Sequence, residues 1–207
     1  LYLGTRLTAG NEFHIFDVSN PEDPQHLGSR EINHSIRDIG MSGDYAYLAT
    51  TADSNEIIRL NVENPTSIQP PWGGPGSIEP GFNASGNENG ESIFVLGNKI
   101  YLGRARSASN PELYILDKSN LSSLQNARLN LNPNSAVIKS IAVSGKFVFL
   151  GTSDSNKEFQ VWHTSNGLSF LSSFNFPQAI TDIEYLDDKV YAAVDSNNAF
   201  HIIYDEP

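Results

Sequence analysis

One short segment recurs four times along the chain and constrains the fold more than any other feature of the sequence. The segment FDVSNPEDPQHL (16–27) returns as LNVENPTSIQPP (60–71), LDKSNLSSLQNA (116–127) and WHTSNGLSFLSS (162–173). Recurrence on this scale is the signature of a fold built from repeated supersecondary units, each of which buries its apolar face against its neighbours. We therefore expect a row of similar units.

A predicted hairpin accompanies each copy of the segment. The hairpins cover residues 39–50, 93–104, 141–152 and 183–194. Ile39 and Met41 alternate with smaller or polar neighbours, a period of two that a strand satisfies and a helix does not. Three of the turns place Gly at the first central position, where a type II′ hairpin needs positive φ; these are Gly43-Asp44, Gly97-Asn98 and Gly145-Lys146, with Asp187-Asp188 as a weaker fourth version.

A third and a fourth strand complete each unit. The third strands are predicted at 12–19, 56–63, 112–119, 158–165 and 199–206, and the fourth at 25–32, 122–131 and 168–176, with a poor counterpart near 67–73. The recurring segment lies between them, where Asn and Asp bond locally to the backbone and Pro ends the ladder. Four short antiparallel strands cannot shield both of their faces, so the units are expected to pack radially as a β-propeller.

The predicted fold class is an all-β propeller of four-stranded antiparallel blades, with about five blades. We expect one domain over 1–207, and the blades are a partial blade 1–35, whole blades at about 36–73, 91–131 and 138–176, an insertion at 70–90 and a partial blade 180–207. The alternative is that these blades form part of a six- or seven-bladed ring made by a longer chain.

Two stretches, HIFDVSNPEDPQHLGS and IRDIGMSGDYAYLAT, carry a family resemblance. They resemble the LVIVD-repeat propellers of bacterial and archaeal surface proteins. Leu121 and Gly167 stand where that pattern has Pro, and His163 stands where it has Asp. The resemblance implies an extracellular or cell-surface location and brings no general set of catalytic residues.

Composition narrows the classes of partner. The chain has 13 Lys and Arg against 24 Asp and Glu, a net charge of −11, which disfavours nucleic acid. No stretch approaches the roughly 20 apolar residues that cross a bilayer, so no membrane insertion is expected within this segment. Without Cys the chain has no thiol chemistry, and the five His residues show no metal-ligand spacing. We expect no cofactor and no metal.

Acidic residues recur before the third strands. Glu12, Glu56, Glu112 and Glu158 occupy one equivalent position. A calcium site needs six to eight oxygens that converge on one ion, and the D-x-D-x-D-G loop that supplies them is absent. We therefore attribute these carboxylates to turn chemistry.

Candidate ligand-binding residues lie where the repeat varies. Near the start of the inner strand, one equivalent position carries Arg37, Glu91, Lys139 or Thr181. Variation at a repeated place is what a binding mouth at a propeller channel would show, although solvated charges lining a wet channel would show it too. Arg104 and Arg106 are expected at the same rim, where guanidinium forks hold a carboxylate or sulfate, or form an ordinary surface pair.

The insertion at 70–90 is the largest departure from the repeat. It contains two aromatic residues, Trp72 and Phe82. If these aromatic side chains are exposed, they would contact a partner. If they fold back, they would cap the gap to the neighbouring blade, which is the interpretation we favour.

These patterns indicate a non-enzymatic extracellular or cell-surface interaction module that presents loops to a protein or glycan partner. One alternative is a hydrolase with its site at the central-channel mouth. Another is a structural spacer in a larger envelope or appendage protein.

Overall fold

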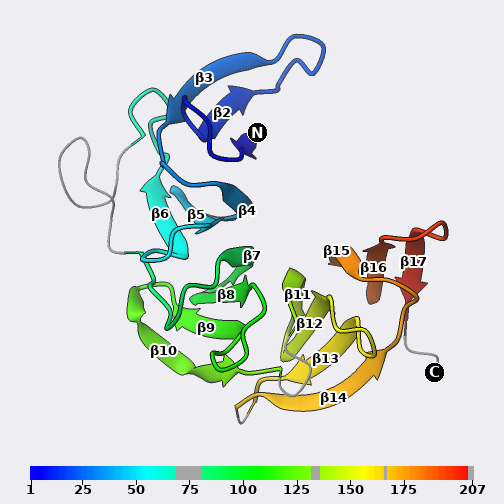
Figure 1. The fold of residues 1–207 in the computed structure, drawn as a ribbon. Helices are drawn as coiled ribbons and strands as arrows, with labels where there is room; N and C mark the ends of the chain where they lie inside the picture. Colours follow the sequence, from blue (N-terminus) through cyan, green and yellow to red (C-terminus); the bar gives the residue numbers. More distant parts are fainter. Residues whose placement is uncertain (69–80, 132–135, 166, 205–207) are drawn as a thin grey trace. The chain divides into compact units, whose positions relative to one another are not determined.

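The computed structural model describes residues 1–68, 81–131, 136–165 and 167–204 (Figure 1). Within these residues the chain forms strands and no helix. The strands are β1 Tyr2–Gly4, β2 Phe13–Asp17, β3 Gln25–Arg30, β4 Ile36–Ser42, β5 Tyr45–Thr50, β6 Ile57–Asn61, β7 Gly90–Leu96, β8 Lys99–Arg104, β9 Leu113–Asp117, β10 Asn120–Leu129, β11 Ile138–Ser144, β12 Phe147–Thr152, β13 Phe159–His163, β14 Ser169–Phe174, β15 Ile180–Leu186, β16 Lys189–Val194 and β17 Phe200–Ile203.

Five sheets agree with the prediction of about five blades. Their strand orders are β1-β2-β3, β4-β5-β6, β10-β9-β8-β7, β11-β12-β13-β14 and β15-β16-β17. Within the described residues two sheets have four strands and three sheets have three, so the predicted bounds of whole and partial blades stay a prediction. The fold is therefore an all-β propeller with about five blade positions.

The tight turns follow the predicted chemistry. Gly43, Gly97 and Gly145 have φ values of 56°, 59° and 55°, and the residue after each Gly is not in the positive-φ region, as a type II′ turn requires. In the fourth hairpin both Asp187 (φ 50°) and Asp188 (φ 59°) are positive, which is the pattern of a type I′ turn. The chain therefore solves the same reversal by two turn types.

The recurring segment ends the third strand by a local hydrogen bond. The Ser19 N–H donates to Asp17 Oδ1 (2.8 Å), the Glu63 N–H to Asn61 Oδ1 (2.9 Å) and the Ser119 N–H to Asp117 Oδ1 (2.8 Å). In the fourth copy the Ser165 N–H donates to His163 Nδ1 (3.3 Å), so an imidazole nitrogen replaces the side-chain oxygen of Asp or Asn. This substitution explains how His163 fits a position that elsewhere carries Asp or Asn.

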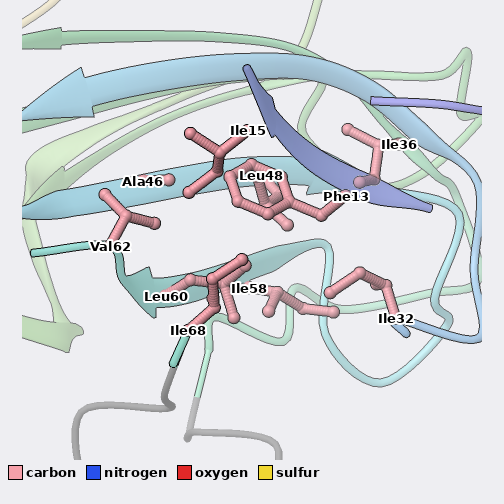
Figure 2. Close-up of a cluster of buried hydrophobic side chains, with 10 residues drawn as sticks. All are labelled: Phe13, Ile15, Ile32, Ile36, Ala46, Leu48, Ile58, Leu60, Val62 and Ile68. Carbon is pink, nitrogen blue, oxygen red and sulfur yellow. The ribbon is translucent and has the colours of Figure 1, made fainter. Parts of the chain in front are cut away.

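The chain divides into two compact units, Leu1–Val95 and Leu96–Pro207, and the division falls within β7. The single domain over 1–207 stays a prediction. In the first unit, side chains of β2, β4, β5 and β6 gather in one apolar cluster (Figure 2), made by Phe13, Ile15, Ile32, Ile36, Ala46, Leu48, Ile58, Leu60, Val62 and Ile68. In the second unit, the corresponding cluster is Ala142, Phe159, Phe176, Ile180, Ile183, Val190, Ala192 and Val194.

Candidate functional site

The variable position of the inner strand is a β-bulge. The strand register breaks between Ile36 and Asp38, between Ile138 and Ser140 and between Ile180 and Asp182. Arg37, Lys139 and Thr181 are the residues that these breaks leave without a partner in the ladder, and all three are exposed. Bulges re-aim side chains beside the ladder. The bulge therefore explains why this position tolerates such different residues.

Two of the predicted rim residues, Arg37 and Glu91, form an ion pair. Arg37 Nε lies 3.8 Å from Glu91 Oε2 in the first unit, and their side chains are 38% and 15% exposed. An ion pair of this kind contributes about 0–1 kcal/mol. In the second unit, the Thr181 hydroxyl donates to the Ala193 carbonyl (3.2 Å), which lies in its own sheet. The structure leaves the ligand-binding role of Arg37, Glu91, Lys139 and Thr181 a prediction.

The residues that follow the bulges connect neighbouring inner strands. Asp38 Oδ2 accepts the Ile93 N–H (2.8 Å). In the second unit, Ser140 Oγ donates to Asp182 Oδ1 (2.6 Å) and accepts the Ile183 N–H (3.1 Å). The sequence reasoning missed this role, although a polar residue at the third position of each inner strand was a visible signal.

Arg104 differs from its expected place at the rim. Its side chain is fully buried, its guanidinium carbon lies 5.6 Å from the centre of the Tyr114 ring, and Nη1 donates to the Pro111 carbonyl (3.3 Å). Burial arises because the end of the second strand is covered by the loop that leads into the third. Arg106 is exposed. The expected exposure of Arg104 at the rim is therefore wrong, whereas an anion-binding role for Arg104 and Arg106 stays a prediction.

Phe82 folds back onto the second blade. It is only 8% exposed. The Ile57 N–H donates to the Phe82 carbonyl (3.2 Å), and the Phe82 N–H donates to the Ile57 carbonyl (3.1 Å). Phe82 is therefore not exposed as partner contact would require, and it pairs with its own blade. Capping of the neighbouring blade gap stays a prediction. Trp72 lies outside the described residues, as does most of the weak fourth-strand match at 67–73. Phe82 supplies the outer pairing of β6 instead.

The four recurring glutamates form a repeated buried clasp. Each is 0–3% exposed, and each carboxylate accepts a backbone N–H from just beyond the fourth strand. The pairs are Glu12 with Ile32 (2.9 Å), Glu56 with Ala84 (2.9 Å), Glu112 with Leu131 (2.9 Å) and Glu158 with Phe176 (2.9 Å). Turn chemistry in a polar loop does not describe these residues, because their main partners are 18–28 residues away in the chain.

The clasp follows one register rule in the four blades that carry it. The residue after each Glu is paired with a residue of the outer edge of the blade. The residue two positions after that outer-edge partner donates its N–H to the Glu carboxylate. The outer-edge partners are Arg30, Phe82, Leu129 and Phe174, opposite Phe13, Ile57, Leu113 and Phe159. Phe82 is thus the equivalent of a fourth-strand residue, and the insertion rejoins the blade at the regular place.

Glu12 shows the electrostatics of the clasp. Burial raises the pKa of its carboxyl, but hydrogen bonds from the backbone of Ile32 and Thr8 outweigh that effect, and the pKa lies below its ordinary value. The pKa of neighbouring Glu31 is raised by desolvation and by its contact with Glu12. The clasp at Glu12 therefore holds a charged carboxylate.

An apolar groove lies between the last two sheets of the second unit. Its volume is about 480 Å³, and its lining includes Phe147, Phe149, Leu171, Phe174, Tyr185 and Tyr204. The Phe149 and Tyr185 rings are stacked with centres 5.3 Å apart, and the Tyr185 hydroxyl donates to Asp188 (2.8 Å). Phe147, Leu171 and Phe174 are 43%, 50% and 55% exposed. The first unit has a hollow of about 540 Å³ beside Leu1, Phe16 and Glu63.

Within the described part of the chain, no three His, Asp or Glu side chains are grouped to hold a metal ion. The same residues contain no helix long and apolar enough to cross a membrane.

Comparison with known proteins bears on the fold. Residues 8–30 and 35–68 match the family model of the LVIVD repeat. These two segments cover the recurring turn and the strands β2 to β6. No curated protein matches the chain.

Several solved structures are similar to the chain. One is the computationally designed Ika4 protein (TM-score 0.58, 13% identity, 82% of this chain and 91% of that one). Another is the Cps50 (Swd1) β-propeller domain of Myceliophteria thermophila, with a TM-score of 0.56 and 14% identity over 94% of this chain and 64% of that one. A third is a putative 6-phosphogluconolactonase from Bacteroides uniformis, with a TM-score of 0.62 and 13% identity over 98% of this chain and 66% of that one. The chain spans about two thirds of the last two, and at such identities the likeness shows the fold alone. The chain is a β-propeller that contains LVIVD repeats.

Proposed function

We propose that this protein is a non-enzymatic interaction module, located outside the cell or at the cell surface, that binds a protein partner through the groove of its second unit. The supporting observation is the groove's lining of partly exposed Phe147, Leu171 and Phe174. Large apolar side chains gathered on a surface mark interaction sites, and aromatic anchors supply much of the binding energy of protein interfaces.

The chemistry of the groove favours a protein over an anionic ligand. Among the described residues of its lining, Asp188 is the one that carries a charge, and it accepts a hydrogen bond from the Tyr185 hydroxyl. An apolar side chain of a partner would displace water from the ring faces without leaving a buried charge unpaired. A glycan stacked on the same rings is the other outcome that the test separates.

The test compares partner binding by two matched variants. Leu171→Asp places a charge in the groove, whereas Leu7→Asp places one at an equally exposed leucine in the first unit. Binding of each variant to arrays of extracellular proteins and glycans, followed by titration calorimetry on the hits, measures the effect. We expect Leu171→Asp to abolish binding and Leu7→Asp to retain it. Equal binding by both variants would remove the groove from the proposal.

A hydrolase is the second candidate, favoured by the likeness to a structure titled a putative lactonase. Its site would use the inner-strand residues, among them Arg37 and Glu91. Turnover of a lactone and ester panel that disappears in Glu91→Gln, with folding unchanged, would replace the interaction module by this function. A spacer would show neither turnover nor groove-dependent binding.

A further inference from the structure

Two histidines from neighbouring strands meet on one face of the first sheet. His14 lies on β2 and His26 on β3, and His14 Nδ1 is 3.4 Å from His26 Nε2. The two residues are 12 positions apart in the chain, and the pairing of β2 with β3 brings them together. Spacing along the sequence therefore does not reveal this pair.

The His14 ring has a defined orientation and a defined proton position. Its Nε2 lies 2.9 Å from the Asn11 carbonyl, which can only accept, so Nε2 carries the hydrogen and Nδ1 of the neutral ring carries a lone pair. Asn11 is held in turn, because its Nδ2 donates to Ser29 Oγ (2.7 Å). A hydrogen bond from the second ring nitrogen to a backbone carbonyl is a usual way in which proteins orient a metal-ligating imidazole.

The repeat builds this anchor in more than one blade. Gln160 is the second residue of β13, as His14 is of β2, and its Nε2 donates to the Lys157 carbonyl (3.2 Å). His201 is the second residue of β17, and its Nε2 donates to the Asn198 carbonyl (2.9 Å). In each case the acceptor lies three residues before the donor. The loop before the strand therefore holds the His14 ring, and a Gln side chain makes the same bond.

The separation of the two nitrogens fits two ligands of one tetrahedral ion. Zn–N bonds of about 2.0–2.1 Å at the tetrahedral angle place two ligand nitrogens about 3.3–3.4 Å apart. Square-planar geometry would place them closer, at about 2.8–3.0 Å. The Phe16 ring centre lies 5.0 Å from that of His26 and covers one side of the pair with apolar surface. The net charge of −11 favours a cation.

The repeat also shows that the outer position of the pair stays accessible where another blade comes before it in the chain. The register places Phe170 opposite Trp162, as it places His26 opposite Phe16. The third and fourth sheets belong to the same compact unit, and Phe170 is nevertheless 42% exposed. The ammonium group of Lys157 reaches its ring face, at 4.8 Å from the ring centre. Accessibility is therefore a property of this position in the repeat.

We infer that His14 Nδ1 and His26 Nε2 bind one Zn²⁺ ion on the outer part of the first blade, with water in the remaining positions. No third His, Asp or Glu of the described residues joins them, so the site is open and its ion exchangeable. His26 is exposed, so its Nδ1 can carry the ring hydrogen towards solvent when Nε2 binds the ion. The site lies in the first unit and goes beyond the proposed function, which uses the groove of the second.

The test titrates the 207-residue chain with Zn²⁺ and follows binding by calorimetry and by the imidazole signals in nuclear magnetic resonance spectra. Mg²⁺, which prefers oxygen ligands, is the control ion. The repeat supplies the variants. His14→Gln introduces the residue of position 160, which keeps the bond to the loop carbonyl and removes the ligand nitrogen, and His26→Phe introduces the residue of position 170. His201→Gln is the matched control, because it removes an imidazole held in the same way.

We expect the parent chain and His201→Gln to bind one Zn²⁺ ion, with shifted ring signals from His14 and His26 and no response to Mg²⁺. Zn²⁺ should also raise the melting temperature of both proteins, because an ion that binds the folded state stabilises it. His14→Gln and His26→Phe should each lose the saturable binding and the thermal shift. His26 is exposed, so His26→Phe tests the site without disturbing packed residues.

Three results would overturn the inference. One is a parent chain whose His14 and His26 signals do not move at the highest Zn²⁺ concentration that keeps it soluble. Another is undiminished binding by His26→Phe. The third is a loss in His201→Gln as large as that in His14→Gln, which would show that scattered surface histidines bind the ion.

Discussion

Removal of one clasp should destabilise a whole blade, and Glu12 offers the sharpest case. Its carboxylate accepts the N–H groups of Thr8 (3.1 Å), Ile32 (2.9 Å) and Asn33 (3.1 Å). Glu12→Ala leaves the buried Ile32 N–H without an acceptor. Hydrogen bonds to a charged group contribute about 1.5–3 kcal/mol each, and part of the loss is recovered where water reaches Thr8 and Asn33. We expect a loss of about 2–4 kcal/mol.

This loss is large beside a total stability of about 5–15 kcal/mol. It corresponds to a melting temperature lower by about 10 °C, measured by calorimetry and by urea unfolding followed by circular dichroism. Glu31→Gln is the matched control. It removes a carboxylate whose pKa is raised beside Glu12, so it should leave stability at pH 7 unchanged or slightly higher. A Glu12→Ala variant as stable as Glu31→Gln would refute the clasp.

The clasp also predicts a pH dependence. The pKa of Glu12 is lower in the folded chain than its ordinary value of 4.5, so its contribution is fully present above pH 4.5. The contribution is lost as the pH falls through the folded pKa. The difference in unfolding free energy between the parent chain and Glu12→Gln should therefore shrink in acid. A difference that stays constant down to about pH 2 would contradict a charged carboxylate.

Three further substitutions test other parts of the structure. Gly81→Ala places a Cβ against the Ile57 carbonyl oxygen and should cost about 1–3 kcal/mol by urea unfolding, with lost protection of the Phe82 amide. Gly97→Ala, which meets open space at φ 59°, should cost about 1 kcal/mol. Arg104→Ala should lower the unfolding free energy by about 2–4 kcal/mol, because it empties a buried site, whereas exposed Arg106→Ala should change it by less than about 0.5 kcal/mol. His163→Asp restores the acceptor found in the other copies and should raise the melting temperature slightly at pH 7; a fall would show that the ring contacts with Phe147 matter more.

Local patterns carried most of the fold prediction. The Gly turns, the alternating inner strands and the Asp or Asn bond at the end of the third strand all act over two to four residues, so the chain order itself displays them. The clasp could not be predicted in this way, because Glu12 and Ile32 are brought together only after the fourth strand has paired. A glutamate recurring before an apolar strand was visible, but its burial was not.

The same separation between local and long-range contacts explains the errors at the candidate site. Arg104 ends a strand, and its sequence position says nothing of the loop that covers it. Arg37, Lys139 and Thr181 share a position that the sequence revealed, whereas the bulge that exposes them depends on the partner strand. The sequence shows which side chains are charged, but the exposure of each side chain depends on the residues that pack against it.

The clasp also accounts for the insertion in the second blade. The connection from β6 to Phe82 comprises residues 62–81, against residues 18–24 between β2 and β3. Loop-closure entropy grows only with the logarithm of length, so this difference costs about 1 kcal/mol. The charged bond from Ala84 to Glu56 offsets that amount by itself. A blade closed at Phe82 and Ala84 therefore tolerates a longer connection. Glu56→Ala, which removes that bond, should therefore cost more than the closure entropy, about 1.5–3 kcal/mol by urea unfolding.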